Sequence, residues 1–158
     1  MAEFWTLGRF DAPMQSDMPQ SVETRQGYHR CVRLADGRFH LVKPGPLAHL
    51  FYCGDSILAS ETFAELLREM CSHCLEFRRT EIVQIATGER FGTYFEVIAN
   101  DKITPESIGK VSAVGFHAWR YGSRHLFVTP AVADEIRKRG FDEITFSPGF
   151  SDFAAAAA

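Results

Sequence analysis

Two stretches of the chain repeat one arrangement of apolar and polar positions. A short apolar run opens each stretch and ends in a hydroxyl residue, Ser60 in the first and Thr129 in the second. Apolar residues then recur at helical spacing, and an offset of 69 residues superimposes 57–77 on 126–146 without a gap. In each stretch the pattern predicts a strand, a hydroxyl-capped helix with one apolar face, and a second strand.

The second copy also carries residues that favour helix boundaries. Pro130 occupies the first helical position, where its missing N–H costs no hydrogen bond. Gly140 follows the helix, and glycine readily adopts the left-handed conformation that ends one. The repeat is compatible with an internal duplication or with convergence on a common strand–helix–strand pattern. Two copies are too few for a solenoid.

Alternating residues outside the repeat predict two hairpins. Residues 28–34 and 38–42 alternate loosely around an Asp-Gly dipeptide, which favours a tight turn. Residues 82–85 and 94–98 flank the sequence ATGERFG, which is expected to form the tip of a second hairpin.

These elements predict an α+β fold, with a mixed, mostly antiparallel sheet and two short helices in a repeated strand–helix–strand pattern. The aromatic run EFWTL at 3–7 is a candidate first strand, and residues 8–27 and 101–110 are expected to be loops. Residues 1–153 are expected to form a single domain. The alanine run at 154–158 is expected to be a tag remnant or unassigned side chains.

Composition and charge exclude several classes of protein. The 158 residues are 46% hydrophobic and 23% charged, which is neither a disordered nor a fibrous composition. A net charge of -3 gives no electrostatic case for non-specific binding to nucleic acid or to an anionic membrane. Because no stretch has the pattern of a membrane span or a signal peptide, we expect a cytoplasmic protein. Its four cysteines are then expected to be thiols.

One cysteine pair has the spacing of half a metal site. Cys71 and Cys74 lie in the sequence CSHC at a predicted helix end, where both sulfur atoms could bind one zinc ion. The sequence has no second CxxC, so structural thiols are favoured over zinc or redox chemistry, and no metal or other cofactor is predicted. Further zinc ligands would have to come from Cys31, Cys53, His40, His49 and His73.

An aromatic and basic segment, FHAWRYGSRH, precedes the second copy. Trp, Tyr and Arg dominate binding hot spots because each buries a large area and forms directed contacts. The same mixture could stack on nucleobases, and the alternative is an ordinary strand and loop whose Trp is core. The segment is nevertheless the best candidate for a partner-binding patch, which would consist of His117, Trp119, Arg120, Tyr121 and Arg124.

The second copy resembles the C-terminal signature of imm11-type immunity proteins, which belong to bacterial polymorphic-toxin systems. The SILASETFAELLREM stretch is similar to the helix opening in the middle of that family, and EFWTL is similar to its aromatic N-terminus. The chain lacks the CxxCG pairs of a related immunity family. The resemblance implies a class of protein rather than roles for single residues. It rests on Leu126, Phe127, Val128, Thr129, Ile136, Gly140, Ile144 and Phe146.

This resemblance implies a non-enzymatic, cytoplasmic protein that binds a cognate toxin and neutralises it by occluding the active site. Two other classes stay open at this point. A small enzyme could use Cys–His or zinc chemistry, although no Cys–His pair here has a local signature. A nucleic-acid-binding module could use the aromatic and basic segment, although the charge disfavours it. A homodimer is left open, and no membrane partner is expected.

Overall fold

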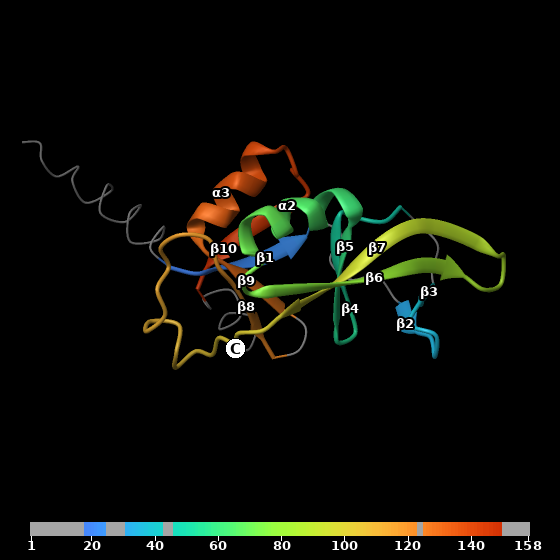
Figure 1. The fold of residues 1–158 in the computed structure, drawn as a ribbon, viewed down its shortest axis with the longest axis horizontal. Helices are drawn as coiled ribbons and strands as arrows, with labels where there is room; N and C mark the ends of the chain where they lie inside the picture. The colour runs from blue at the N-terminus through green and yellow to red at the C-terminus, as the bar shows by residue number, and fades with distance from the viewer. Residues whose placement is uncertain (1–17, 25–30, 43–45, 123–124, 150–158) are drawn as a thin grey trace, which may run out of the picture.

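The computed structural model of the protein describes residues 18–24, 31–42, 46–122 and 125–149 (Figure 1). Ten strands and two helices form within these ranges, and most strand pairs are antiparallel. The predicted α+β class and the mixed, mostly antiparallel pairing are confirmed. The strands are divided between two sheets, however, whereas the sequence predicted one. The segments 3–7 and 154–158 lie outside the described residues.

The larger sheet has six strands in the order β2-β3-β6-β7-β5-β4. All neighbours are antiparallel except β3 and β6, which are parallel. β6 and β7 form a long hairpin that extends from the body of the molecule (Figure 1). The strands are β2 (Cys31–Arg33), β3 (Phe39–Leu41), β4 (Leu50–Cys53), β5 (Ser56–Ser60), β6 (Leu75–Gln84) and β7 (Glu89–Ala99).

The smaller sheet has four antiparallel strands in the order β10-β1-β9-β8. Its strands come from both ends of the described chain, so this sheet can close only when distant segments meet. They are β1 (Gln20–Thr24), β8 (Ala118–Tyr121), β9 (His125–Val128) and β10 (Ile144–Pro148).

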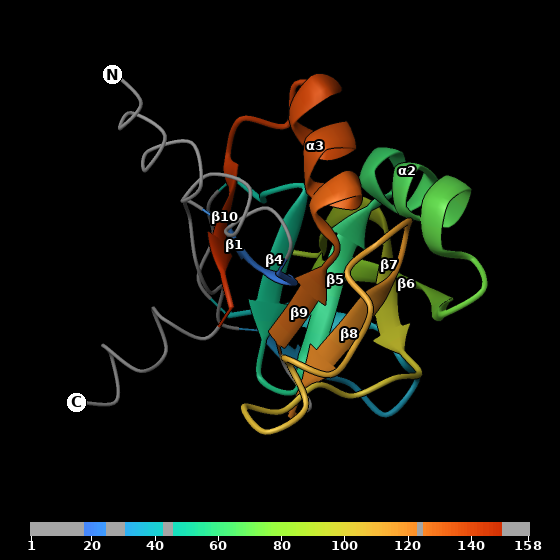
Figure 2. The same ribbon diagram turned by 90° about the vertical axis from the view of Figure 1, so that its left-hand side faces the viewer.

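The repeated strand–helix–strand pattern is confirmed in both sheets. Helix α2 (Glu61–Cys71) connects β5 to β6, and helix α3 (Pro130–Lys138) connects β9 to β10. In each copy the two connected strands are separated by one strand antiparallel to both, β7 in the first copy and β1 in the second. Both copies therefore have the same split arrangement, completed by a strand from outside the repeat. The two helices lie near each other at one end of the molecule (Figure 2).

The two helix N-termini differ in their caps. The hydroxyl of Ser60 accepts a hydrogen bond from the Phe63 N–H (3.3 Å), as predicted. Thr129 precedes α3 but its side chain makes no cap bond, so this part of the prediction is wrong. Its hydroxyl instead accepts from the His117 N–H (3.3 Å), which ties the start of α3 to the residue before β8. Pro130 begins α3, and Gly140 follows it with φ of +86°, as predicted.

The predicted loop at 8–27 is wrong for residues 20–24, which form β1. The sequence QSVET has a single strongly apolar residue, Val22, so no alternating pattern marks it as a strand. It is a strand because β10 and β9 pair with it on both sides. Ser21 is buried there and donates its hydroxyl to the Ser147 carbonyl oxygen (3.2 Å). Tertiary pairing thus overrides local propensity.

Both predicted hairpins form, with altered limits. β2 and β3 pair across the Asp-Gly turn, where Gly37 has φ of +92°, and residues 28–30 lie outside the described ranges. The second hairpin is longer than predicted, because β6 is continuous from Leu75 and includes the strand that follows α2. Glu89 and Arg90, expected at the tip, already belong to β7. Residues 101–110 are largely irregular, as predicted.

The six-stranded sheet is strongly curled. Arg33 on β2 donates from Nη2 to the Ser56 hydroxyl on β5 (3.0 Å), although four strand steps separate β2 from β5. A flat sheet would place these strands about 19 Å apart at the usual spacing. The main core contains apolar residues of both sheets and both helices, including Val22, Ala59 and Ile136. The two sheets and the helices therefore share one apolar interior.

Candidate functional site

The predicted partner-binding patch centres on a tryptophan that is core. Trp119 is 4% exposed and forms a small cluster with Ile103 and Phe127. Residues of the loop between β7 and β8, among them Ile108 and Val111, cover this cluster. The alternation of β8 points Ala118 into the main core and Trp119 towards the covering loop. Because Trp119 is buried, its side chain is not available on the surface as the predicted anchor.

The neighbouring patch residues are partly exposed and hold the loop in place. Arg120 donates from Nε to the Ala99 carbonyl oxygen (3.1 Å) and from Nη1 to that of Gly122 (2.8 Å). Its backbone pairs with Asp101 and Ile103, which fixes the end of β7 beside β8. Tyr121 packs edge-on against Phe127. Arg124 lies outside the described residues, and the partner-binding role of this set stays a prediction.

His117 lies just before β8 and is fastened by several contacts. Its Nε2 is 2.7 Å from a carboxylate oxygen of Asp101, and its N–H donates to the Thr129 hydroxyl. The Thr129 N–H returns a bond to the His117 carbonyl oxygen (3.0 Å). The imidazole ring also lies 4.8 Å from the Trp119 ring, centre to centre. The position and orientation of His117 are therefore fixed by backbone and side-chain contacts together.

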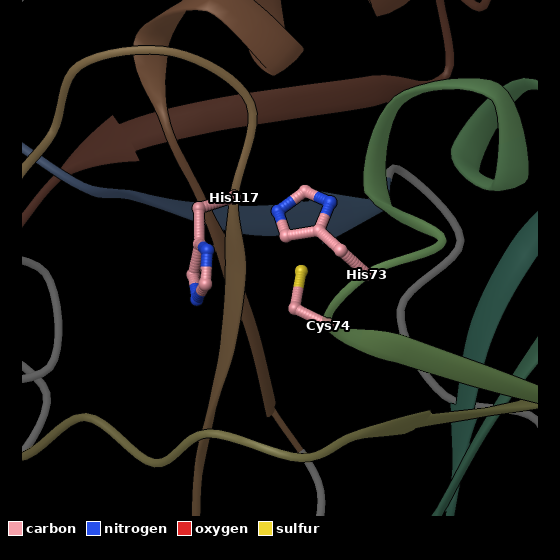
Figure 3. Close-up of side chains that lie close together, drawn as sticks. All are labelled: His73, Cys74 and His117. Carbon is pink, nitrogen blue, oxygen red and sulfur yellow. The ribbon is translucent and has the colours of Figure 1, made fainter.

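His117 meets the CSHC turn across the fold. His73 and Cys74 lie in the turn between α2 and β6, and Figure 3 shows them facing His117 from the opposite side. The sulfur of Cys74 and one ring nitrogen of each histidine all lie within 4.8 Å of one another. We call His73, Cys74 and His117 the His–Cys–His cluster.

Backbone hydrogen bonds explain this meeting of distant segments. The Cys74 N–H donates to the Cys71 carbonyl oxygen (3.0 Å), which closes the turn after α2. The Asn100 N–H then donates to the Cys74 carbonyl oxygen (3.0 Å), so the end of β7 lies beside the turn. Asp101 follows directly and contacts His117. The cluster is thus assembled where the residues that follow β7 bond to the turn before β6 on one side and to β8 on the other.

The four cysteines are free thiols, as predicted. Burial raises the pKa of Cys71 to about 12 and also raises the pKa of Cys74. Of the ligands that the sequence offered for the CSHC pair, His73 is near Cys74. Cys53 is a member of a separate apolar cluster, against which Cys31 packs. His40 contacts the Ile85 N–H, and His49 the Ser60 hydroxyl.

An exposed apolar segment lies immediately before His117. Val114 is 87% exposed and Phe116 is 45% exposed. Gly115 between them has φ of +80°, a conformation that favours glycine and turns the chain here. The segment lies between two fixed points, because Val111 packs against the Trp119 cluster and His117 is bonded to Asp101 and Thr129. We call residues 112–116 the apolar loop.

A separate polar hollow of about 520 Å³ lies on the curled sheet. Glu96 is buried in it and bonds Arg33 Nη2 at 2.6 Å, and this bond raises the pKa of the Arg33 guanidinium. Arg79 is exposed and has no ion-pair partner among the residues that the structure describes. The arginines that line the hollow are Arg33, Arg38, Arg78 and Arg79, and the carboxylates that line it are Asp36, Glu81 and Glu96.

No protein-family model, curated protein or solved structure matches this chain. Within the described ranges, neither helix is long and apolar enough to cross a membrane.

Sequence reasoning missed the partner of the CSHC turn and the apolar loop. His117 was identified as a contact residue, but nothing in the sequence indicates that it meets His73 and Cys74. The aromatic and basic residues suggested binding at 117–124, whereas the exposed apolar residues lie just before them. The available signal was the sequence Val114-Gly115-Phe116, which places two apolar residues around a glycine after a loop-like stretch.

Proposed function

We propose that this protein is an immunity protein that binds the catalytic domain of a cognate bacterial toxin and occludes its active site. The observation that carries the proposal is the apolar loop, which presents Val114 and Phe116 to solvent between two fixed points. Exposed apolar side chains on a held segment lose little conformational entropy on binding, so they suit a protein interface. The resemblance of the second copy to polymorphic-toxin immunity proteins supplies the identity of the partner.

The apolar loop also offers a mechanism of inhibition. It belongs to the long loop between β7 and β8, which runs along the outside of the molecule (Figure 1), and an exposed loop can enter the cleft of an enzyme. Its exposed aromatic residue, Phe116, would be the anchor, and the half-buried Tyr121 would extend the contact. Inhibition would then be steric, with no covalent step on either protein.

The test is co-expression of this chain with the product of the neighbouring gene. A one-to-one complex and rescue of growth are expected. Phe116→Asp should weaken the complex by about tenfold or more, since burying a carboxylate in place of an aromatic anchor is unfavourable. The matched control is Ile85→Asp, because Ile85 is also exposed (61%) but lies at the β6–β7 turn. Both variants should keep the thermal midpoint of the parent protein.

Two results would contradict the proposal. The first is a neighbouring product that is neither toxic nor bound. The second is an equal loss of binding in Phe116→Asp and Ile85→Asp, since that would mean the apolar loop has no special part in the interface.

A Cys–His enzyme is the second candidate, because a thiol, an imidazole and a carboxylate lie side by side in space. The Cys74 thiol is near the His117 ring, and that ring contacts the Asp101 carboxylate. Against it, Cys74 is 2% exposed and its pKa is raised, whereas nucleophilic cysteines are accessible and have a lowered pKa. Rapid alkylation of Cys74 by iodoacetamide at about pH 7 would favour the enzyme. Slow alkylation, like that of an ordinary buried thiol, would favour the binding protein.

A nucleic-acid-binding module has weaker support. Stacking on nucleobases needs an accessible aromatic face, and the tryptophan of the aromatic and basic segment is buried.

A further inference from the structure

We propose that the His–Cys–His cluster binds a divalent transition-metal ion of the zinc class. Zinc accepts imidazole nitrogen and thiolate sulfur as ligands, which are the groups that meet here. The proposal differs from the sequence-based prediction of no metal. It is independent of the toxin proposal, because metal binding can be measured on the purified protein alone.

The spacing of the three groups is close to that of a metal centre. Ligand atoms about 2.0–2.3 Å from a tetrahedral ion lie roughly 3.3–3.8 Å from one another. In the structure these atoms lie within 4.8 Å of one another, so a shift of about 1 Å would complete the geometry. His73 is exposed and can make most of this movement by side-chain rotation. Cys74 and His117 are held by the backbone bonds of the β6–β7–β8 region.

Asp101 provides a second, independent indication of a metal site. Its carboxylate lies 2.7 Å from Nε2 of His117, which leaves Nδ1 of that ring for a metal. A histidine that binds zinc usually donates its other nitrogen to a carboxylate or carbonyl, which fixes the tautomer and orients the ring. Neither ring nitrogen of His73 has a hydrogen-bond partner within the described part of the chain, so both remain able to coordinate.

Three protein ligands leave one position of a tetrahedral ion open. The exposed side of the cluster is at His73, so the open position would be filled by water or by a side chain of a bound protein. The ion would also join the turn after α2 to His117, which directly follows the apolar loop.

The test is a Co²⁺ titration of the purified protein after treatment with a chelator. One Co²⁺ per chain is expected, with a thiolate-to-cobalt charge-transfer band and the visible bands of tetrahedral cobalt, all displaced by Zn²⁺. Cys74→Ser should abolish the charge-transfer band. His73→Gln and Asp101→Asn should each weaken binding by about tenfold or more. The controls are Cys31→Ser and His40→Gln, which change a cysteine and a histidine elsewhere and should bind cobalt normally.

The His73→Gln variant keeps the test decisive if a buried variant fails to fold, because His73 is exposed and its loss should leave the circular dichroism spectrum unchanged. The proposal is overturned if chelated protein binds no Co²⁺. It is equally overturned if cobalt binds but the charge-transfer band persists in Cys74→Ser, or if His73→Gln binds cobalt as tightly as the parent. In those cases His117 and Asp101 form an ordinary surface hydrogen bond.

Discussion

The hydroxyl group of Tyr52 occupies the point at which β1 and β9 separate. These strands pair only at Gln20 with Val128 and at Ser21 with Phe127, and the same register would place Val22 opposite Leu126. Instead, Tyr52 from the other sheet donates to the Val22 carbonyl oxygen (2.6 Å) and accepts from the Leu126 N–H (3.4 Å). One side chain thus replaces a missing pair and joins the two sheets.

Removing this hydroxyl should be costly. Tyr52→Phe leaves a buried carbonyl and a buried N–H without partners, so we expect the free energy of unfolding to fall by about 1–3 kcal/mol. The control is Tyr94→Phe, since the Tyr94 hydroxyl is also buried but donates a single bond, to the Ala48 carbonyl oxygen (3.1 Å). Urea denaturation of both variants checks this. A smaller loss in Tyr52→Phe than in Tyr94→Phe would contradict the joining role.

Single residues were harder to place from sequence than their chemistry suggested. Trp119 is of a residue type that is common in hot spots. It is buried because the loop between β7 and β8 packs over it, and no local sequence pattern indicates this packing. His117 was identified as a contact residue, yet its neighbours Asp101 and His73 are brought to it by backbone bonds between segments distant in sequence. The chemistry of each side chain could be read from the sequence, whereas its spatial neighbours became known only from the fold.

At the scale of elements, the repeat was predictable because each helix is short, amphipathic and bounded by residues with known preferences. Phe63, Leu67 and Met70 are all buried at the spacing of one helix face. The strand that completes each copy was not predictable. β1 is mostly polar in sequence and is defined by its two partners. β7 was expected as a hairpin strand, but its second pairing, with β5, was not indicated by any local pattern.

The different N-termini of the two helices give a prediction at this scale. Ser60→Ala should destabilise the protein by about 1 kcal/mol, because it removes the bond to the Phe63 N–H at the start of α2. Thr129→Val should leave the N-terminus of α3 unchanged, because the Thr129 side chain makes no cap bond there, but it should free the His117 N–H, so its effect should appear in the region before β8. Amide hydrogen exchange separates the two cases. Faster exchange in the first turn of α3 in Thr129→Val would contradict this assignment.

At the scale of the whole molecule, the shared core should make the two sheets unfold together. The main core takes side chains from β1 and β9 in one sheet, from β4, β5 and β7 in the other, and from both helices. Neither sheet can therefore bury its apolar face without the other. The overall class could be predicted from sequence, but the division into two sheets depends on pairings between distant segments.

Trp119 offers a probe of this cooperativity. The sequence has two tryptophans, so Trp5→Phe leaves Trp119 in the smaller sheet as the only one. Its fluorescence and the far-ultraviolet circular dichroism should change at the same urea concentration, as in a two-state transition. Two separated transitions would mean that the sheets are independent units.

The most direct test of the binding account is amide hydrogen exchange of this protein with and without the toxin encoded by the neighbouring gene. The apolar loop and the half-buried end of β8 at Tyr121 should become protected in the complex, because they would be covered by the toxin. The polar hollow around Arg33 and Arg79 should exchange as in the free protein. Protection at the hollow with an unchanged apolar loop would contradict the account.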